Sequence, residues 1–170
     1  SVEALFTVAI PPSRPETGYG YIQPGPSLPS PEGLEAFQVK AFVEKPNAET
    51  AASFLEEGFL WNSGIFLWRA AHFLREVQEV APEIGDLLPF LEKGDVEGFF
   101  REAPSISVDE AVLERSSRVA SLRATFEWDD VGSWESLRRT HQAEEAGNIL
   151  LGGVTSLESE ANVVLAEVGS

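Results

Sequence analysis

Apolar residues along the first third of the chain follow two different periods. Residues 4–10 form a continuous apolar run that ends at two prolines, which is typical of a buried strand. Residues 37–43 alternate between apolar and polar positions, as a half-buried strand does. Residues 48–55 carry apolar side chains at helical spacing, so we predict a helix with Asn47 as its N-cap and Gly58 as its stop.

The middle of the chain continues this interleaving. An apolar run at residues 65–68 predicts another strand, introduced by a small polar corner at residues 62–64. Helical spacing then extends over residues 73–81, and a further short helix is predicted over residues 84–91. Strands and helices therefore follow one another with short connections.

The last third begins with a helix start signal. Ser107 and Glu110 have the spacing of a capping box, and the apolar residues 111–113 follow, so a helix is predicted there. Residues 118–126 are predicted to form a strand. That strand leads into the sequence FEWDDVGSW, after which Ser133 can cap another helix.

Two regions lack such periodicity. Residues 11–36 are rich in Pro, Gly and Ser and are predicted to be a loop with one short strand at residues 19–22. Residues 148–170 carry short β-type runs between Gly and Asn, as at the start of a β-roll or of a second domain. We therefore expect one domain over residues 1–147 and a β-rich segment over residues 148–170.

Strands alternating with helices predict an α/β fold, a sheet with helices on its faces. In such sheets ligands bind in the loops at the carboxyl ends of the strands. Polar corners occur at three strand ends or starts, namely at residues 44–46, 62–64 and 129–132. These corners are the candidate functional positions.

Composition narrows the chemistry. The chain has 170 residues and carries 28 Asp plus Glu against 12 Lys plus Arg, a net charge of -16 at pH 7. This charge argues against a nucleic-acid or anionic-membrane partner, because both need a basic surface. No run approaches the length of a membrane span, so a soluble, cytoplasmic protein is expected.

Residue types exclude several kinds of site. There is no cysteine, and His72 and His141 are the two histidines, so thiolate nucleophiles, disulfides and histidine-rich metal sites are excluded. Oxygen ligands for a hard cation such as Mg²⁺ remain, because carboxylates are abundant.

Asp129 and Asp130 could form an acid/base pair, but neighbouring residues on an extended segment point to opposite faces. A split role is therefore favoured, with one acid as a Mg²⁺ ligand at the ligand edge and the other supported by hydrogen bonds. The alternative is an ordinary turn before a capped helix, and the spacing alone favours that alternative slightly.

The other corners have simple alternatives too. Glu44 could accept hydrogen bonds from hydroxyls and Lys45 could meet a phosphate, although a surface ion pair has the same sequence. Asn62 could offer an amide group to a ligand, and Gly64 could let the ligand approach the backbone closely. The alternative is that these residues form an ordinary turn. Tyr19, beside Gly20, could face a sugar ring or lie in an edge strand.

Five motifs in this order closely resemble the mannose-1-phosphate guanylyltransferase family of sugar nucleotidyltransferases. They are RPETGYGYI, VKAFVEKP, WNSGIFLWRA, PSISVDEAVLE and WDDVGSW, and the resemblance covers nearly all of residues 4–140. It implies the C-terminal half of a Rossmann-like domain, a mixed sheet with flanking helices, followed by the start of a β-helical tail. The implied reaction converts mannose 1-phosphate and GTP to GDP-mannose and pyrophosphate, with Mg²⁺.

The resemblance also implies roles for particular residues. Lys45 would bind the sugar phosphate and Asp130 a Mg²⁺ ion, and these two are the catalytic candidates, while Asp129 is less constrained. The remaining substrate-binding candidates are Tyr19, Gly20, Glu44, Asn62, Gly64 and Trp128. The partners would be the two small-molecule substrates, and a homo-oligomer stays open.

One part of the family pattern is missing. Nothing in the 170 residues resembles the Gly-rich loop that cradles the nucleotide triphosphate, so the segment alone is expected to show no turnover. Three alternatives stay open at this point: a non-catalytic sugar-phosphate-binding or regulatory module, a pyrophosphorylase for another hexose 1-phosphate, and a purely structural acidic domain.

Overall fold

The computed structural model describes residues 3–132, 134–143 and 146–166. The chain divides into two compact units, residues 1–126 and residues 127–170, and each is described by itself. In the described part of the chain, no helix is long and apolar enough to cross a membrane.

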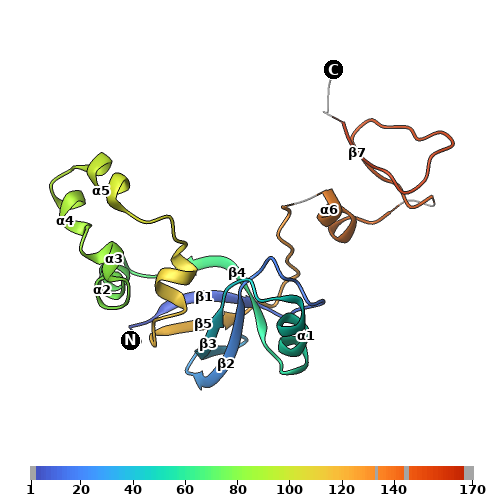
Figure 1. The fold of residues 1–170 in the computed structure, drawn as a ribbon. Helices are drawn as coiled ribbons and strands as arrows, with labels where there is room; N and C mark the ends of the chain where they lie inside the picture. The colour runs from blue at the N-terminus through green and yellow to red at the C-terminus, as the bar shows by residue number, and fades with distance from the viewer. Residues whose placement is uncertain (1–2, 133, 144–145, 167–170) are drawn as a thin grey trace. The chain divides into compact units, whose positions relative to one another are not determined.

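A five-stranded barrel forms the centre of the first unit (Figure 1). Its strands are β1 (Leu5–Ile10), β2 (Tyr21–Leu28), β3 (Ala36–Val43), β4 (Leu60–Leu67) and β5 (Val119–Arg123). The order around the barrel is β1-β4-β2-β3-β5. β1 pairs in parallel with β5, and every other neighbouring pair is antiparallel.

The predicted mixed α/β fold is confirmed, but its sheet is a closed barrel of five strands and not a plain Rossmann-like sheet. β5 pairs with both β1 and β3, so the sheet closes on itself. Closure depends on which strands meet across long stretches of chain, and the alternation of apolar residues along each strand carries no such information.

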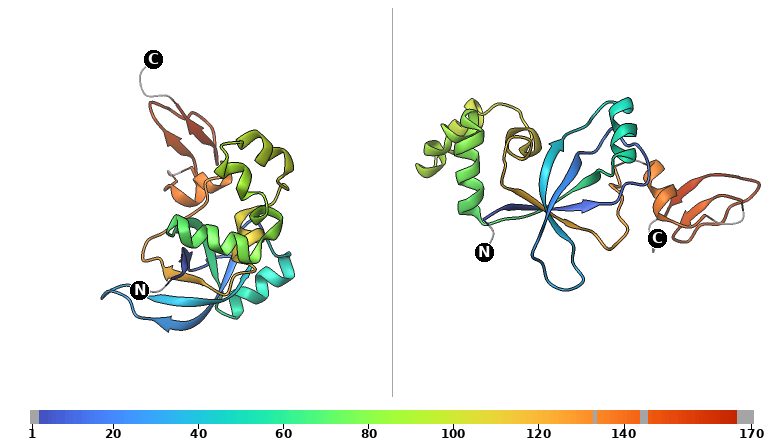
Figure 2. Two further views of the ribbon diagram at one scale, coloured as in Figure 1. Left: turned by 90° about the vertical axis from the view of Figure 1, so that its left-hand side faces the viewer. Right: turned by 90° about the horizontal axis from the view of Figure 1, so that it is seen from below.

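β2 is much longer than the predicted strand at residues 19–22, because it continues through Pro24 and Pro26. Beyond Ile22 it pairs with β3 alone, and the β2–β3 register shifts between Gln23 and Ser27. Prolines are tolerated where a strand has an irregular or single-sided ladder. Figure 2 shows this hairpin projecting away from the other barrel strands.

Helix α1 (Ala48–Glu56) joins β3 to β4 and matches its prediction. Asn47 is its N-cap, and the Asn47 Oδ1 accepts a hydrogen bond from the Thr50 amide at 2.9 Å. Gly58 follows the helix with φ 77°, a left-handed conformation that suits glycine.

Four short helices follow β4 and lie together beside the barrel (Figure 1). They are α2 (Ala70–Val80), α3 (Pro82–Gly85), α4 (Leu88–Glu92) and α5 (Val96–Glu102). The single helix predicted over residues 84–91 is thus divided between α3 and α4, and α5 was not predicted. Asp95 caps α5 by accepting a hydrogen bond from the Gly98 amide at 2.8 Å.

The segment between α5 and β5 forms a π-helical turn, η1 (Asp109–Leu113), instead of the predicted α-helix. The capping box that predicts a helix start here is present. The Glu110 amide donates to Ser107 Oγ at 3.2 Å, and Ser107 Oγ donates to Glu110 Oε2 at 3.1 Å. π-Helical turns are rare and frequently occur at functional sites.

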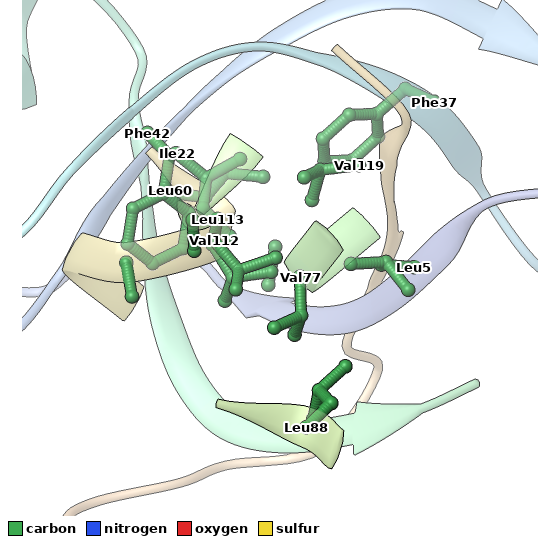
Figure 3. Packing of buried hydrophobic residues seen from close by; sticks show 13 residues of the cluster. Leu5, Ile22, Phe37, Phe42, Leu60, Val77, Leu88, Val112, Leu113 and Val119 are labelled. Atoms are coloured by element: carbon green, nitrogen blue, oxygen red, sulfur yellow. The ribbon is translucent and has the colours of Figure 1, made fainter. Parts of the chain in front are cut away.

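The hydrophobic core fills the barrel and continues under the helices. Inward-facing residues come from all five strands, from η1 and from α2 and α4 (Figure 3). Those labelled in the figure are Leu5, Ile22, Phe37, Phe42, Leu60, Val77, Leu88, Val112, Leu113 and Val119. Because η1 contributes two of these side chains, the core fixes the position of Asp109 at its start.

The second unit contains α6 (Trp134–Thr140) and a two-stranded parallel sheet of β6 (Ile149–Leu151) and β7 (Val163–Leu165). The predicted cap Ser133 lies outside the described residues. Asn148 Oδ1 accepts a hydrogen bond from the Asn162 amide at 2.9 Å, and Asn148 Nδ2 donates to the Ser159 carbonyl oxygen. This pair of asparagines ties the start of β6 to the start of β7.

Candidate functional site

Strand register places three candidate residues in one row at the rim of the barrel. Tyr21, the first residue of β2, pairs with Val43 at the end of β3 and with Trp61 in β4. Because both pairings are antiparallel, the residues next to these partners are also opposite one another. Gly20 therefore lies between Glu44 and Asn62, and the backbone N–H of Asn62 donates to the Gly20 carbonyl oxygen at 2.8 Å.

Gly20 leaves room for the carboxylate of Glu44. A Cβ atom at position 20 would lie 2.6 Å from Glu44 Oε2 and 3.2 Å from the ring of Phe42. Real Cβ atoms do not approach other atoms to 2.6 Å, so a larger residue would displace the carboxylate. The glycine thus determines where Glu44 can point.

Glu44 and Lys45 form an ion pair at this rim, with Lys45 Nζ 3.0 Å from Glu44 Oε1. The Glu44 side chain is 12% exposed and that of Lys45 is 62% exposed, so the ammonium group is available to a ligand. The hydrogen bond and the charge of Glu44 raise the pKa of Lys45 above its usual value, which is already well above neutral pH, so the lysine is cationic there.

The backbone holds this pair in an uncommon conformation. Lys45 has φ 45°, in the left-handed region, and its amide donates to the Tyr19 carbonyl oxygen at 3.2 Å. The Glu44 amide donates to Glu114 Oε1 at 2.7 Å. A non-glycine residue in this region is strained, and such strain is concentrated at functional sites.

Asn62 is buried behind the rim, with 8% of its surface exposed. Its Oδ1 accepts a hydrogen bond from Thr7 Oγ1 at 2.6 Å, and its Nδ2 donates to Asp109 Oδ1 at 3.1 Å. Thr7 belongs to β1 and is 1% exposed. Hydrogen bonds between side chains therefore connect β1 through β4 to η1.

Asp109 was not among the predicted site residues. Its carboxyl is half-buried, and this burial, followed by the nearby charge of Glu44, raises the pKa of Asp109. The available signal was an acid two positions before the apolar run 111–113. It lies inside a capping box that accounts for Ser107 and Glu110 but not for Asp109.

Tyr19 precedes Gly20 and packs against Trp61 of β4. Its ring meets that of Trp61 edge-on with centroids 5.1 Å apart, and its hydroxyl oxygen accepts a hydrogen bond from Arg14 Nη2 at 3.2 Å. The Arg14 guanidinium lies 5.0 Å from the centre of the Trp61 ring. The loop before β2 is therefore held against the barrel by an edge-on aromatic contact and by a cation–π contact.

The predicted polar corner at residues 62–64 is wrong, because these residues lie inside β4. Ala9 pairs with Asn62 and Thr7 with Phe66, so the stretch between them on β4 is longer than on β1 and forms a bulge. Gly64 sits in this bulge with φ 72°, and nothing lies within 4 Å of the position that its Cβ would take.

The remaining candidates belong to the second unit. Asp129 is 8% exposed and forms a two-pronged ion pair with Arg139, at 2.7 Å from Nε and 2.9 Å from Nη2. Asp130 is exposed, and Trp128 is half-buried. One exposed carboxylate fits an ion such as Mg²⁺, which takes one or two protein carboxylates plus substrate oxygens. Among the described residues, no group of three or more acids and histidines is gathered for a metal.

Comparison with known proteins identifies relatives. The nucleotidyl transferase family model matches residues 1–147. A mannose-1-phosphate guanylyltransferase of Escherichia coli is 39% identical over 97% of this chain, and one of Sinorhizobium fredii is 37% identical over 95%. The chain spans 37% and 33% of these two proteins, about a third of the length of the curated relatives that it matches.

Solved structures agree with this relationship. A Thermus thermophilus protein described as mannose-1-phosphate geranyltransferase has a TM-score of 0.81 and 32% identity, with 97% of this chain and 49% of that chain covered. A Helicobacter pylori protein described as mannose-6-phosphate isomerase has a TM-score of 0.62 and 27% identity, with 75% and 52% covered. The family match over most of the sequence, together with the rim residues that carry the motifs, shows that the chain belongs to the nucleotidyl transferase family.

Proposed function

We propose that this chain supplies the sugar-phosphate side of a mannose-1-phosphate guanylyltransferase, which converts mannose 1-phosphate and GTP to GDP-mannose and pyrophosphate. The observation that supports this most directly is the row of Gly20, Glu44 and Asn62 with the Lys45 ammonium group beside it. Relatives named for this activity share 37–39% of their residues with the chain.

The chemistry of the rim suits a sugar phosphate. The Glu44 carboxylate accepts hydrogen bonds, so it can bind sugar hydroxyls, and the Lys45 ammonium can bind the phosphate. In the proposed reaction a phosphate oxygen of the sugar attacks the α-phosphorus of GTP, and pyrophosphate leaves. No protein nucleophile is needed, so catalysis consists of positioning and charge neutralisation.

Lys45 and Asp130 are the proposed catalytic residues. Lys45 would hold the attacking phosphate, and its strained backbone and its contact with Glu44 restrict its direction. Asp130, with Trp128 nearby in sequence, would hold a Mg²⁺ ion, which neutralises phosphate charge when bound. Asp129 would support this segment through its ion pair with Arg139.

Calorimetric titration of the purified chain tests the proposal. Mannose 1-phosphate should bind, and Lys45→Ala should weaken binding about ten- to hundred-fold, since a hydrogen bond to a charged group contributes about 1.5–3 kcal/mol. Lys40→Ala is the matched control. Lys40 is exposed on β3, so its replacement removes the same charge at a position away from the rim.

Two results would contradict the proposal. The first is no binding of mannose 1-phosphate by the wild-type chain, and the second is equal weakening by Lys45→Ala and Lys40→Ala. Titration with glucose 1-phosphate addresses the sugar, since equal affinity for the two epimers would favour a site for hexose 1-phosphates in general. The Gly-rich loop of the family is not found in these residues, so binding is the appropriate measurement and not turnover.

A further inference from the structure

The backbone corner at Glu44 and Lys45 uses a hydrogen-bond acceptor that is not part of the sheet. β3 ends at Val43, and its pairing with β5 covers only residues 36–38. The backbone N–H of Glu44 therefore lies well beyond the last residue that pairs with β5. It donates to Glu114 Oε1 at 2.7 Å, so a side chain supplies the acceptor that a neighbouring strand would otherwise provide.

Glu114 is fixed through its own backbone. It directly follows η1, whose residues Ala111, Val112 and Leu113 are buried in the core. The backbone N–H of Glu114 donates to the carbonyl oxygens of Asp109 and Val112. The Glu114 side chain therefore extends from a rigid point, and its contact with the corner ties the end of β3 to the core through η1.

The corner needs support of this kind to keep its shape. Lys45 has φ 45°, a left-handed conformation that a residue with a Cβ adopts at a cost, and that persists where the surroundings hold it. Two hydrogen bonds do so: the backbone N–H of Glu44 donates to Glu114, and that of Lys45 donates to the Tyr19 carbonyl oxygen at 3.2 Å. The first bond is shorter and has a carboxylate acceptor, and such bonds are about twice as strong as those between neutral groups.

We propose that Glu114 is a positioning residue of the sugar-phosphate site, whose carboxylate holds the corner in the conformation that presents Glu44 and Lys45 to the ligand together. The inference rests on the proposed function of those two residues. Without the contact, the corner would also populate unstrained conformations that separate the two side chains. The apparent affinity would then fall in proportion to the fraction of molecules that keep the competent corner.

The negative charge of Glu114 predicts the opposite effect on binding. The charges of Asp109 and Glu110 already reach Lys45, where they raise the pKa of its ammonium group. Acids close to a phosphate site repel the phosphate, so removal of one more carboxylate should by itself strengthen binding. A loss of affinity after replacement of Glu114 would therefore have a geometric cause and not an electrostatic one.

The test is calorimetric titration of the whole chain with mannose 1-phosphate and with inorganic phosphate. Glu114→Ala should weaken binding of both ligands about three- to tenfold, because one of the two bonds that hold the strained corner is lost. Glu114→Gln loses the same charge but keeps an acceptor oxygen, so it should bind both ligands within about twofold of wild type.

Glu110→Gln is the matched control for charge. It removes a charge that acts on Lys45 but leaves the acceptor of the Glu44 N–H in place, and glutamine can preserve the capping box with Ser107. This variant should bind both ligands at least as tightly as wild type.

The number of binding sites distinguishes positioning from a merely structural role. Positioning lowers the affinity and leaves the stoichiometry of Glu114→Ala equal to that of wild type. Fewer sites at unchanged affinity would mean that part of the sample is unfolded, and would overturn the inference. Equal losses of affinity in Glu114→Ala and Glu114→Gln would also overturn it, because the carboxylate would then act on the ligand through its charge.

The same titrations separate this inference from the proposed function. If wild type binds no mannose 1-phosphate, the proposed function fails and the inference fails with it. If wild type binds and Lys45→Ala weakens binding, but Glu114→Ala binds as tightly as wild type, the proposed function stands and the role of Glu114 is refuted.

Discussion

Replacing Gly20 with alanine tests whether the rim geometry controls ligand binding. The added Cβ would lie 2.6 Å from Glu44 Oε2, whereas ordinary van der Waals contact begins near 3.4 Å. The carboxylate must therefore retreat by about 0.8 Å, the difference between 3.4 Å and 2.6 Å. This movement disturbs the 3.0 Å contact of Glu44 Oε1 with Lys45 Nζ, so both ligand-binding groups change position.

Stability should fall modestly in this variant. The displaced atom is the end of a side chain, and the contact with Phe42 at 3.2 Å needs a shift of only a few tenths of an ångström. Overpacking of this kind costs about 1–3 kcal/mol, and replacing glycine by alanine returns about 0.4–1 kcal/mol through the unfolded state. We expect a loss of about 1 kcal/mol in the free energy of unfolding, and about a tenfold loss of affinity for mannose 1-phosphate.

Gly18→Ala is the control for this experiment. Gly18 lies in the same loop, but its Cβ would meet Glu16 Oε1 at 3.5 Å, an ordinary contact. Calorimetric titration gives the affinities, and denaturant unfolding gives the stabilities. If Gly20→Ala binds as tightly as Gly18→Ala, the position of Glu44 does not control binding and the reasoning fails.

Three further predictions concern stability. Asp109→Asn should raise the melting temperature at pH 7 but not below about pH 3.8. The pKa of Asp109 is raised in the folded state, so ionisation of this carboxyl costs stability at pH 7, and asparagine removes that cost. An equal gain in melting temperature at both pH values would contradict this. Glu76→Ala should lower the free energy of unfolding by about 2 kcal/mol, since the buried carboxylate binds Arg118; Glu79→Ala, at a more exposed acid, should cost less. Asn47→Ala should cost about 1 kcal/mol by removing the cap of α1, and Asn47→Ser should retain most of it; a cost under 0.3 kcal/mol would argue against the cap.

Local signals predicted individual elements well. Asn47 and Gly58 bracket α1, and the alternation over 37–43 identifies β3, because caps, stops and periods depend on neighbours in sequence. The path of β2 through Pro24 and Pro26 was missed, since only the single-sided pairing of that segment makes the prolines acceptable. Closure of the barrel was missed for the related reason that it joins residues far apart in the chain.

The site was partly predictable. Motif resemblance selected Gly20, Glu44 and Asn62, and strand register brings these three together. The resemblance did not reveal Asp109, because its importance comes from a hydrogen bond to a residue 47 positions away. The corner interpretation of Asn62 was wrong for a similar reason: a bulge inside β4 has the same small polar residues as a turn.

Closure of the barrel has a consequence for folding. The parallel pair of β1 and β5 joins Leu5 to Val119, so the last strand must be synthesised before the barrel can form. Until then β1 and β3 each lack one neighbour, and unpaired strand edges are prone to associate with other chains. Long-range pairing also slows folding. Expression at low temperature or with chaperones should therefore improve the yield of native protein.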